Sequence, residues 1–456
     1  MPKPGGTADL PVSGDPAREA ALGASALRKA GWRLLPILAI GYGMAFMDRI
    51  NISFASLRMN DDLHFSATVY GIGAGIFFVG YALCEVPSNL LMLRFGARKW
   101  LTRIMFTWGL LAMAMMLVRT PFEFYTVRLL LGISEAGFFP GVIYYLTLWF
   151  PASVRGRAIS RFYISGSLSS AVSGALAGFL LGLNGRLGLT GWQWLFLAEG
   201  LPTVLFSAVV FFFLPDSPAH ARWLTGEEKG WLERRLSEDA AQAHLGHDAG
   251  VMKALLSPKV WMMGIFFFCL LTCFYGYSFS APAIFQIATG WSVTRVGFAI
   301  AIIGVAGAAA MLLGGFSSDR TGERALHCII PCGVMAVCFV LASFAHTGWL
   351  VVGSMALMWM AFQALEAPAL ALPTQFLAGP ACAAGIAAMN TITMFSGFLG
   401  PFWMGRMKDL TGSYWLGLRG LAVPAMAAAG FMFLLTRSLA RHKAPQPTAN
   451  LADEPA

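Results

Sequence analysis

The segment Gly41–Ala55, GYGMAFMDRINISFA, carries an acid and a base side by side, Asp48 and Arg49, inside an apolar run that begins at Trp32. A charge at the centre of a bilayer costs about 2.5–3.5 kcal/mol on insertion scales, so such side chains rarely face lipid. The pair must therefore face protein or water. Ionisable groups in this position are functional candidates, and a structural ion pair that only fixes helix packing is the alternative.

Helical spacing places other polar residues of the apolar segments on shared faces. Residues three, four or seven positions apart lie on one stripe of a helix. Arg128, Gly132 and Glu135 therefore share a stripe, and Tyr81 and Glu85 share another. These stripes supply the further acids and bases that a polar site inside a membrane protein would need.

Asp48 and Arg49 cannot point the same way. Adjacent residues differ by about 100° around a helix, so Arg49 shares a stripe with Tyr42 and Ser53 while Asp48 faces other neighbours. Burial among apolar side chains disfavours the charged form of a carboxylate, as a proton carrier requires. If Asp48 or Glu135 holds the guanidinium only when ionised, protonation frees it for a solute carboxylate, and proton and anion bind with positive coupling.

Several candidates also have structural interpretations. Arg128 can anchor its own helix, and Glu85 can bond to backbone at a helix break before Pro87. Tyr275 can line a helix interface. Asn390 lies within an apolar segment, where an amide must find a partner.

The composition predicts an all-α polytopic membrane protein. Of the 456 residues 57% are hydrophobic and 12% are charged, and a spanning helix needs about 20 apolar residues. No basic helix is interleaved with stacking aromatic residues, which excludes a nucleic-acid-binding protein despite the net charge of +9. The apolar runs cover residues 33–55, 68–93, 100–118, 122–149, 157–183, 192–214, 258–287, 292–316, 325–344, 348–376, 381–406 and 415–436.

The distribution of basic residues predicts the orientation. If the twelve spans alternate, most lysines and arginines fall on one side, which the positive-inside rule assigns to the cytoplasm together with both termini. Arg406 and Lys408 are the exception. We therefore expect a multi-pass protein of the cell inner (plasma) membrane. The basic residues of the predicted cytoplasmic side are Arg28, Lys29, Arg33, Arg94, Arg98, Lys99, Arg103, Arg155, Arg157, Arg161, Arg437, Arg441 and Lys443.

A long polar segment divides the chain into two similar halves. Thr225 and Glu228 within it form the signature of a capping box, which predicts a short amphipathic helix. The predicted organisation is a disordered tail over 1–32, a six-helix bundle over 33–214, a cytoplasmic linker over 215–257, a second bundle over 258–437 and a cytoplasmic tail over 438–456.

The two halves repeat each other at a nearly constant offset. The stretch LRFGARK aligns with SDRTGER, pairing Arg94 with Arg320 at an offset of 226, and SEAGFFP aligns with LEAPALA, pairing Glu135 with Glu366 at an offset of 231. Two matches at this spacing suggest a duplicated six-helix unit. Many transporters build their binding site between two such repeats.

No metal or cofactor is expected. The seven cysteines lie in apolar segments and are odd in number, so we interpret them as packed, reduced thiols. His327, Cys328 and Cys332 have the residue types of metal ligands, but packing is the preferred interpretation.

Two motifs resemble the major facilitator superfamily: G-x-x-x-D-R-x-G at residues 315–322 and R-x-x-x-G at residues 128–132. Four longer segments resemble its anion:cation symporter family, in the bacterial branch that takes up tartrate, phthalate, hydroxyphenylacetate and similar carboxylates. The resemblance extends from about residue 33 to 436. The segments are MDRINISFA, GYALCEVPSNLLMLRFGARKW, RLLLGISEAGFFPGVIYYLTLWFP and GWQWLFLAEGLP.

The resemblance implies twelve transmembrane helices in two pseudo-symmetric six-helix bundles that rock around a central cavity. It also implies a monomer that imports a small organic anion by proton symport. The residues matching the family's proton sites are Asp48 and Glu135, and Arg49 and Tyr81 match its substrate contacts. We add Tyr42, Tyr275 and Asn390 as substrate-binding candidates, and Arg128, Gly132, Glu85, Asp319 and Arg320 as structural or gating candidates.

Three departures keep the substrate open. Leu93 replaces the usual loop aspartate of the first half, Ser280 stands where relatives often have tryptophan, and Met394 stands where they often have a second asparagine. The resemblance therefore does not specify which carboxylate is carried or how many protons accompany it.

Other functions were weighed. An exchanger or uniporter of the same fold and a transporter-like sensor both remain alternatives. A phosphate-ester exchanger would want a second arginine in 258–287, where the basic residue is Lys259. A membrane-embedded enzyme would use Asp61, Asp62 and His64, which lie in a predicted outward loop, so no enzymatic activity is expected.

Overall fold

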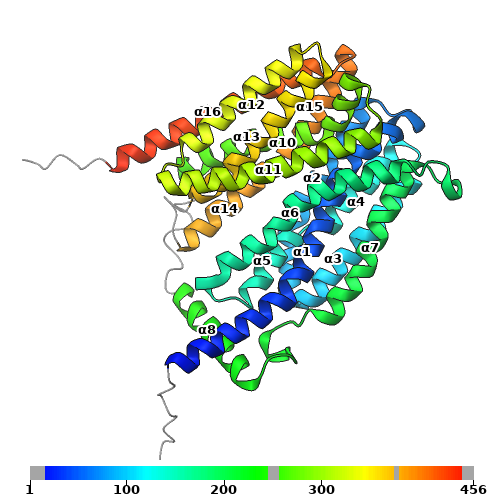
Figure 1. Ribbon diagram of the computed structural model, residues 1–456. Coiled ribbons are helices and arrows are strands. Elements are labelled where there is room, and N and C mark those ends of the chain that lie inside the picture. The colour runs from blue at the N-terminus through cyan, green and yellow to red at the C-terminus, as the bar shows by residue number, and fades with distance from the viewer. Residues whose placement is uncertain (1–15, 245–255, 374–378, 444–456) are drawn as a thin grey trace, which may run out of the picture.

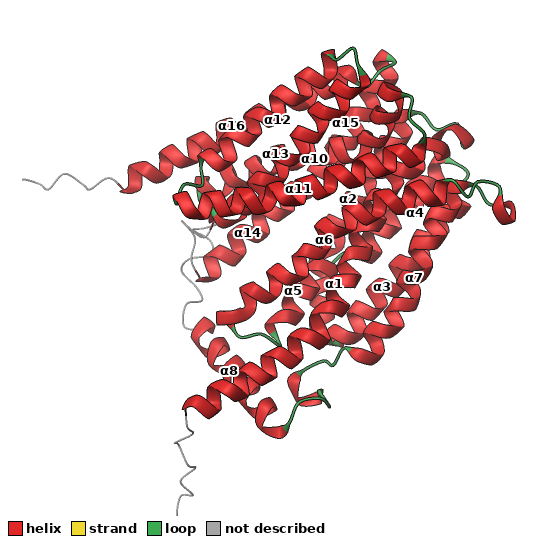
Figure 2. Cartoon of the chain, viewed as in Figure 1, coloured by secondary structure: helices red, strands yellow, loops and turns green. Residues whose placement is uncertain are grey.

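The computed structural model describes residues 16–244, 256–373 and 379–443, and within these ranges the secondary structure is helical, with no strand (Figure 2). The first bundle contains α1 (Pro16–Asp62), α2 (Ala67–Phe95), α3 (Ala97–Ala114), α4 (Pro121–Glu135), α5 (Phe138–Thr147), α6 (Ala152–Leu181) and α7 (Gly191–Phe213). The second contains α10 (Pro258–Thr289), α11 (Val293–Thr321), α12 (Leu326–Phe344), α13 (Gly348–Ala371), α14 (Gly379–Met394), α15 (Ser396–Thr411) and α16 (Trp415–Lys443). Between them lies α8 (Gly226–His244).

The predicted all-α fold with many membrane-crossing helices is confirmed. Ten helical segments of the described chain are long and apolar enough to cross a membrane, and α4 and α5 together count as one of them. The more polar α6 and the consecutive pair α14 and α15 bring the candidates in the described chain to twelve. Their helical hydrogen bonds satisfy the backbone internally, as a bilayer requires.

The span expected over residues 122–149 is broken in its middle. Pro140 has no N–H and its ring crowds the carbonyl four residues earlier, which disfavours a continuous helix there. The break uses Gly137 in the left-handed region at φ +86°. Glu135 is thereby the last residue of α4, next to non-helical backbone.

The prediction of a disordered tail over residues 1–32 is wrong for residues 16–32, because α1 begins at Pro16. The alanine-rich sequence favours a helix, and α8 packs against it. Lys29 Nζ and Ser25 Oγ each donate to Glu228 Oε1 at 2.8 Å. Residues 1–15 lie outside the described residues.

The predicted capping box of the linker helix is confirmed. The backbone N–H of Thr225 donates to Glu228 Oε2 at 2.8 Å, and the N–H of Glu228 donates to Thr225 Oγ1 at 3.3 Å. Burial alone would raise the pKa of Glu228, but the bonds from Lys29, Thr225 and Ser25 outweigh it and lower that pKa from 4.5 to about 2. The start of α8 is therefore held to α1 by an ionised carboxylate.

The two bundles meet tightly at one end and diverge toward the other, where α8 and both ends of the described chain lie (Figure 1). At the closed end α2 packs on α15 and α6 on α11. The contact is between backbones: a Cβ added to Gly405 would lie 2.1 Å from the carbonyl oxygen of Ala67, and one on Gly297 would lie 2.3 Å from that of Gly174. Small residues allow this approach.

Candidate functional site

A cavity of about 210 Å³ lies between the two bundles. Six of the predicted site residues line it, namely Tyr42, Arg49, Tyr81, Glu85, Tyr275 and Asn390. Most of the remaining wall is aromatic or apolar and comes from α1, α5, α6, α10, α13 and α14. These other lining residues are Phe46, Phe139, Tyr163, Gly166, Leu271, Phe274, Gly304, Trp359, Phe362, Gln363, Glu366 and Met394.

Arg49 is the one basic residue of this lining, within the part of the chain that the structure describes. Its Nη2 lies 2.6 Å from Glu135 Oε1, and its Nε donates to the same oxygen at 2.7 Å. The Arg49 side chain is 20% exposed, whereas that of Glu135 is 0% exposed. The guanidinium therefore reaches the cavity, and its counter-ion lies behind it in the protein.

Aromatic rings hold the guanidinium from its other side. Its carbon lies 4.9 Å from the ring centroid of Tyr81 and 5.7 Å from that of Phe77. The electron-rich face of a ring attracts a cation, so these rings help to keep Arg49 at the wall. The second oxygen of Glu135, Oε2, is buried and has no hydrogen-bond partner among the described residues.

Asp48 belongs to a different network and does not hold Arg49 in this conformation. Trp108 Nε1 donates to Asp48 Oδ2. The amide Nδ2 of Asn51 donates to Glu199 Oε2 at 2.7 Å and lies 3.4 Å from Asp48 Oδ1. Asp48 and Glu199 are both buried, so one neutral amide bridges two carboxylates inside the first bundle.

Arg128 makes the contacts expected of its structural interpretation, in which it anchors its own helix. It is 1% exposed, and its guanidinium donates to the carbonyl oxygens of Gly73 at 3.1 Å and Ala74 at 3.2 Å. Gly132 lies one turn further along α4, where an added Cβ would be 2.0 Å from the carbonyl oxygen of Phe77. Both residues hold α4 against α2, and neither lines the cavity.

Glu85 and Asn390 connect the two bundles across the cavity. Asn390 Nδ2 donates to Glu85 Oε1 at 3.3 Å. Tyr42 packs against Phe162 with ring centroids 4.8 Å apart, and Tyr275 packs against Phe78 at 4.5 Å. Each of the two tyrosines therefore belongs to an aromatic wall of the cavity.

The gating candidates Asp319 and Arg320 lie away from the cavity, and the two positions of the second bundle that depart from the family pattern, Met394 and Ser280, lie apart from each other. Asp319 is 79% exposed at its side chain and lies 3.9 Å from Arg324, while Arg320 is exposed. Met394 lines the cavity, but Ser280 is buried elsewhere in α10. Of the two departures in the second half, only that at Met394 changes the wall around a solute.

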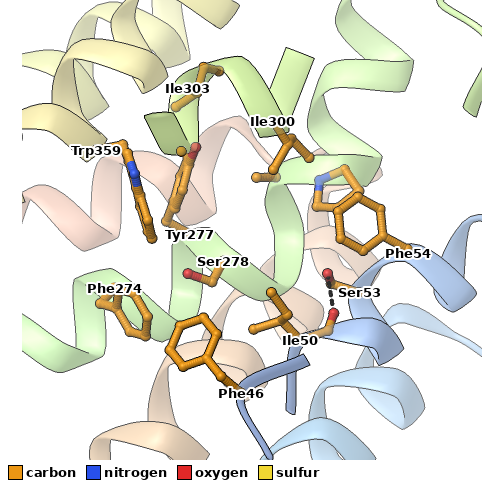
Figure 3. Close-up of a pocket in the computed structure, with 13 residues that line it drawn as sticks. Phe46, Ile50, Ser53, Phe54, Phe274, Tyr277, Ser278, Ile300, Ile303 and Trp359 are labelled. Carbon is orange, nitrogen blue, oxygen red and sulfur yellow. Dashed lines mark hydrogen bonds between the residues drawn. The ribbon is translucent and has the colours of Figure 1, made fainter. Parts of the chain in front are cut away.

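A smaller pocket of about 40 Å³ adjoins the cavity and shares Phe46, Phe274, Gly304 and Trp359 with it (Figure 3). Its other walls are mostly apolar, and the hydroxyl of Ser53 is turned to the carbonyl oxygen of Ile50, 2.7 Å away. No carboxylate and no basic side chain lines it among the described residues. The charged site candidates therefore belong to the larger cavity.

Two functional candidates were missed by the sequence reasoning. Glu199 interrupts an apolar span, which is the same signal that identified Asp48, and Glu366 was noted only for its place in the repeat. Their partners are distant in sequence, so spacing gave no indication of them. Among the described residues no group of histidine, cysteine and acidic side chains is arranged to hold a metal.

Comparisons with known proteins agree with this architecture. A sequence profile of the Major Facilitator Superfamily matches residues 38–401. A protein of Agrobacterium vitis named "Putative tartrate transporter" is 41% identical over 91% of this chain and 92% of its own length. A protein of Acinetobacter baumannii named "Quinolone resistance transporter" is 37% identical over 91% of this chain and 96% of its own.

Solved structures show the same fold. The crystal structure of a bacterial homologue of the human lysosomal transporter Spinster superposes with a TM-score of 0.74 at 17% identity, covering 96% of this chain and 100% of that one. A D-xylose–proton symporter superposes with a TM-score of 0.68 at 18% identity, over 88% and 97%. Profile and relatives exclude the membrane enzyme considered above, and the chain belongs to the Major Facilitator Superfamily of membrane transporters.

Proposed function

We propose that this protein is a secondary transporter that imports a small carboxylate together with protons. The observation that carries the proposal is the pairing of the cavity's single basic residue, Arg49, with the fully buried Glu135. The relative named for tartrate supports a carboxylate. The relative named for quinolones and the aromatic walls support a solute with a ring.

The ionised carboxylate of Glu135 and the solute anion compete for the same guanidinium, that of Arg49. When Glu135 is ionised, it neutralises Arg49 and the cavity has no free positive charge. When Glu135 takes up a proton, the guanidinium offers its planar fork of donors to a solute carboxylate. Each ligand then strengthens binding of the other, as reciprocity of coupling requires.

Asp48 serves as a second proton site in this proposal. It and Glu199 share one amide donor, Asn51, inside an apolar bundle. Two buried negative charges with only neutral donors around them are strongly unfavourable, so the pair holds a proton for part of the cycle. Because Asp48 and Arg49 are adjacent on α1, a change at one acid is transmitted to the other by movement of a single helix.

The charges of the loops indicate to which side of the membrane the cavity opens in this conformation. Arg155 pairs with Asp239 of α8, and Arg157 shares a pocket with Arg28 near the start of α1. Both therefore lie toward the end where the bundles diverge, at which α8 and the start of α1 are found (Figure 1), and this supports a cytoplasmic opening and cytoplasmic termini by the positive-inside rule. The contacts between α2 and α15 then close the outer side. Rocking of the bundles around the cavity provides alternating access, and a monomer in the inner membrane suffices for it.

Uptake into proteoliposomes tests the proposal. Purified protein is given tartrate, phthalate or 4-hydroxyphenylacetate with the outside more acidic than the inside, and a protonophore is the control. Accumulation above equilibrium that the protonophore abolishes supports symport. Uptake that ignores the gradient indicates a uniporter, and uptake that requires solute inside indicates an exchanger.

A further inference from the structure

The charges of the cavity are not those of a site for a plain anion. Glu85 and Glu366 line it, Arg49 is its one basic residue among the described side chains, and Arg49 is paired with Glu135. A dicarboxylate bound there would meet two further carboxylates. A site for anions alone would not be expected to keep acids on its wall.

Glu366 has no ion pair or hydrogen bond to another described residue. The helices α13 and α14 contain no basic side chain, and α10 has only Lys259, in its first turn. Glu85, in contrast, accepts a hydrogen bond from Asn390. Glu366 is therefore the cavity acid that still lacks a partner.

The surroundings of Glu366 are suited to a cation. Trp359, Phe362 and Glu366 lie one turn apart along one face of α13. The ring of Phe274 stacks on Phe362 with centroids 4.8 Å apart and on Trp359 with centroids 5.7 Å apart. Aromatic faces beside a carboxylate are the arrangement that proteins use to bind ammonium groups.

The internal repeat points to the same conclusion. Glu366 corresponds to Glu135 at an offset of 231. In the first bundle Arg49 on α1 supplies the cation for Glu135, but the second bundle has no arginine within α10 to supply one for Glu366. The positive charge that Arg49 supplies to Glu135 in the first bundle therefore has no counterpart for Glu366 in α10.

We infer that the substrate is amphoteric, with a carboxylate that binds Arg49 and a protonated nitrogen that lies between Glu366 and the rings of Phe274, Phe362 and Trp359. The carboxylate end rests on the proposed function, and the nitrogen is the new element. Such a molecule fills both halves of the cavity with opposite charges. An amine without an acid group would leave Arg49 unused, and an acid without a nitrogen would leave Glu366 unpaired.

Matched benzoates test the inference. Binding of 4-(aminomethyl)benzoate, 4-(hydroxymethyl)benzoate and 4-methylbenzoate, with their 3-substituted isomers, is measured by titration calorimetry on the purified full-length protein at neutral pH. We expect at least one aminomethyl isomer to bind about tenfold or more tightly than its methyl counterpart, since a desolvated cation beside rings and a carboxylate gains on the order of 1–2 kcal/mol.

Variants assign the effect to a residue. In Glu366→Gln the preference for the aminomethyl compound is expected to fall to about threefold or less, while 4-methylbenzoate binds at least as well as before. Glu123→Gln, at the outer end of α4, is the matched control for protein quality. Loss of the preference in Glu85→Gln with retention in Glu366→Gln would overturn the assignment.

The remaining outcomes separate this inference from the proposed function. If methylbenzoates bind through Arg49 and the amino group adds nothing, the amphoteric substrate is rejected and the carboxylate transporter stands. An equal gain from the hydroxymethyl compound would make Glu366 a hydrogen-bond acceptor for a neutral group and also reject it. If no benzoate binds, the amphoteric substrate is rejected, and the proposed function is then decided by the uptake assay with tartrate. If Arg49→Ala changes no affinity for a carboxylate that binds, both proposals fail.

Discussion

The two bundles share one fold but differ in the chemistry of their interiors. The first bundle buries Asp48, Arg128, Glu135 and Glu199 inside its membrane segments, whereas the buried polar residues of the second, within the described ranges, are uncharged. The second instead packs cysteine and methionine around its aromatic residues. The two bundles therefore combine a similar set of helices with different interior chemistry.

The difference teaches where coupling can arise. An ion pair or a shared proton has two states, and within the described residues the buried core of the first bundle contains such acids and bases whereas that of the second does not. The second bundle contributes aromatic walls and the carboxylate of Glu366 to the cavity. In the proposed mechanism the first bundle would therefore bind the protons and the solute carboxylate, and the second would supply the facing wall.

The largest effect is expected from Arg49→Ala. Truncating one partner of a desolvated charge pair costs about 2–5 kcal/mol, so uptake of carboxylates should fall at least about thirtyfold. Arg49→Lys should recover only part, because an ammonium lacks the bidentate fork. Initial uptake rates in proteoliposomes measure both, and Arg419→Lys in α16 is the control from the other bundle. Equal rates for Arg49→Ala and wild type would remove the first bundle's special role.

Glu135→Gln is expected to separate transport from its driving force. The amide cannot lose a proton, so accumulation against a gradient should disappear while exchange of labelled for unlabelled solute persists. Glu123→Gln lies on the same helix outside the core and should keep both activities. Persistent accumulation in Glu135→Gln would transfer the coupling to Asp48 alone.

Asn51→Leu should have a moderate effect, mainly on stability. It leaves two buried carboxylates without their shared donor, at a cost of about 1–3 kcal/mol. The second change Glu199→Leu should recover part of this, because replacing both partners by apolar groups is nearly neutral. Melting temperatures of the two single variants and the double variant give the coupling. In the second bundle Cys273→Ala removes one buried thiol contact, to Leu421, and should cost less than Asn51→Leu.

The smallest effect is expected from Glu228→Gln at the end of the first bundle. Its pKa is lowered to about 2 in the folded protein, so the contact of α8 with α1 is fully stabilised above the ordinary value of 4.5. That contact weakens as the pH falls from there toward 2. The protection factors of the α8 amides, which are corrected for the intrinsic pH dependence of exchange, should therefore be constant between pH 5 and 8 in wild type and lower in Glu228→Gln. A strong pH dependence of the wild-type protection factors between pH 5 and 8 would contradict this prediction.

Much of the site was predictable because apolar context makes every polar residue conspicuous. The angle between Asp48 and Arg49 on one helix correctly implied different neighbours, and the residues chosen around Arg49 do line one cavity. The partner of Asp48 was not predictable. Glu199 is 148 positions from Asn51, and helical periodicity says nothing about which helices of a bundle adjoin.

The remaining differences in the fold have local causes. The break after Glu135 depends on Pro140, which is a strong signal inside an apolar run, yet the run is long enough to span without it. The extension of α1 toward Pro16 depends on contacts with α8, in which Trp231 lies against Gly23. Tertiary contacts of this kind add to the helix propensity of the alanine-rich segment.

The contact between the bundles at their closed end brings backbone against backbone, with few side chains between them. Gly174 lies against Gly297, and Gly405 lies against Ala67, with backbone touching backbone. Any larger residue at these points acts as a wedge. Gly297→Trp should therefore hold the two bundles apart at this end and favour the opposite shape, in which the cavity opens here.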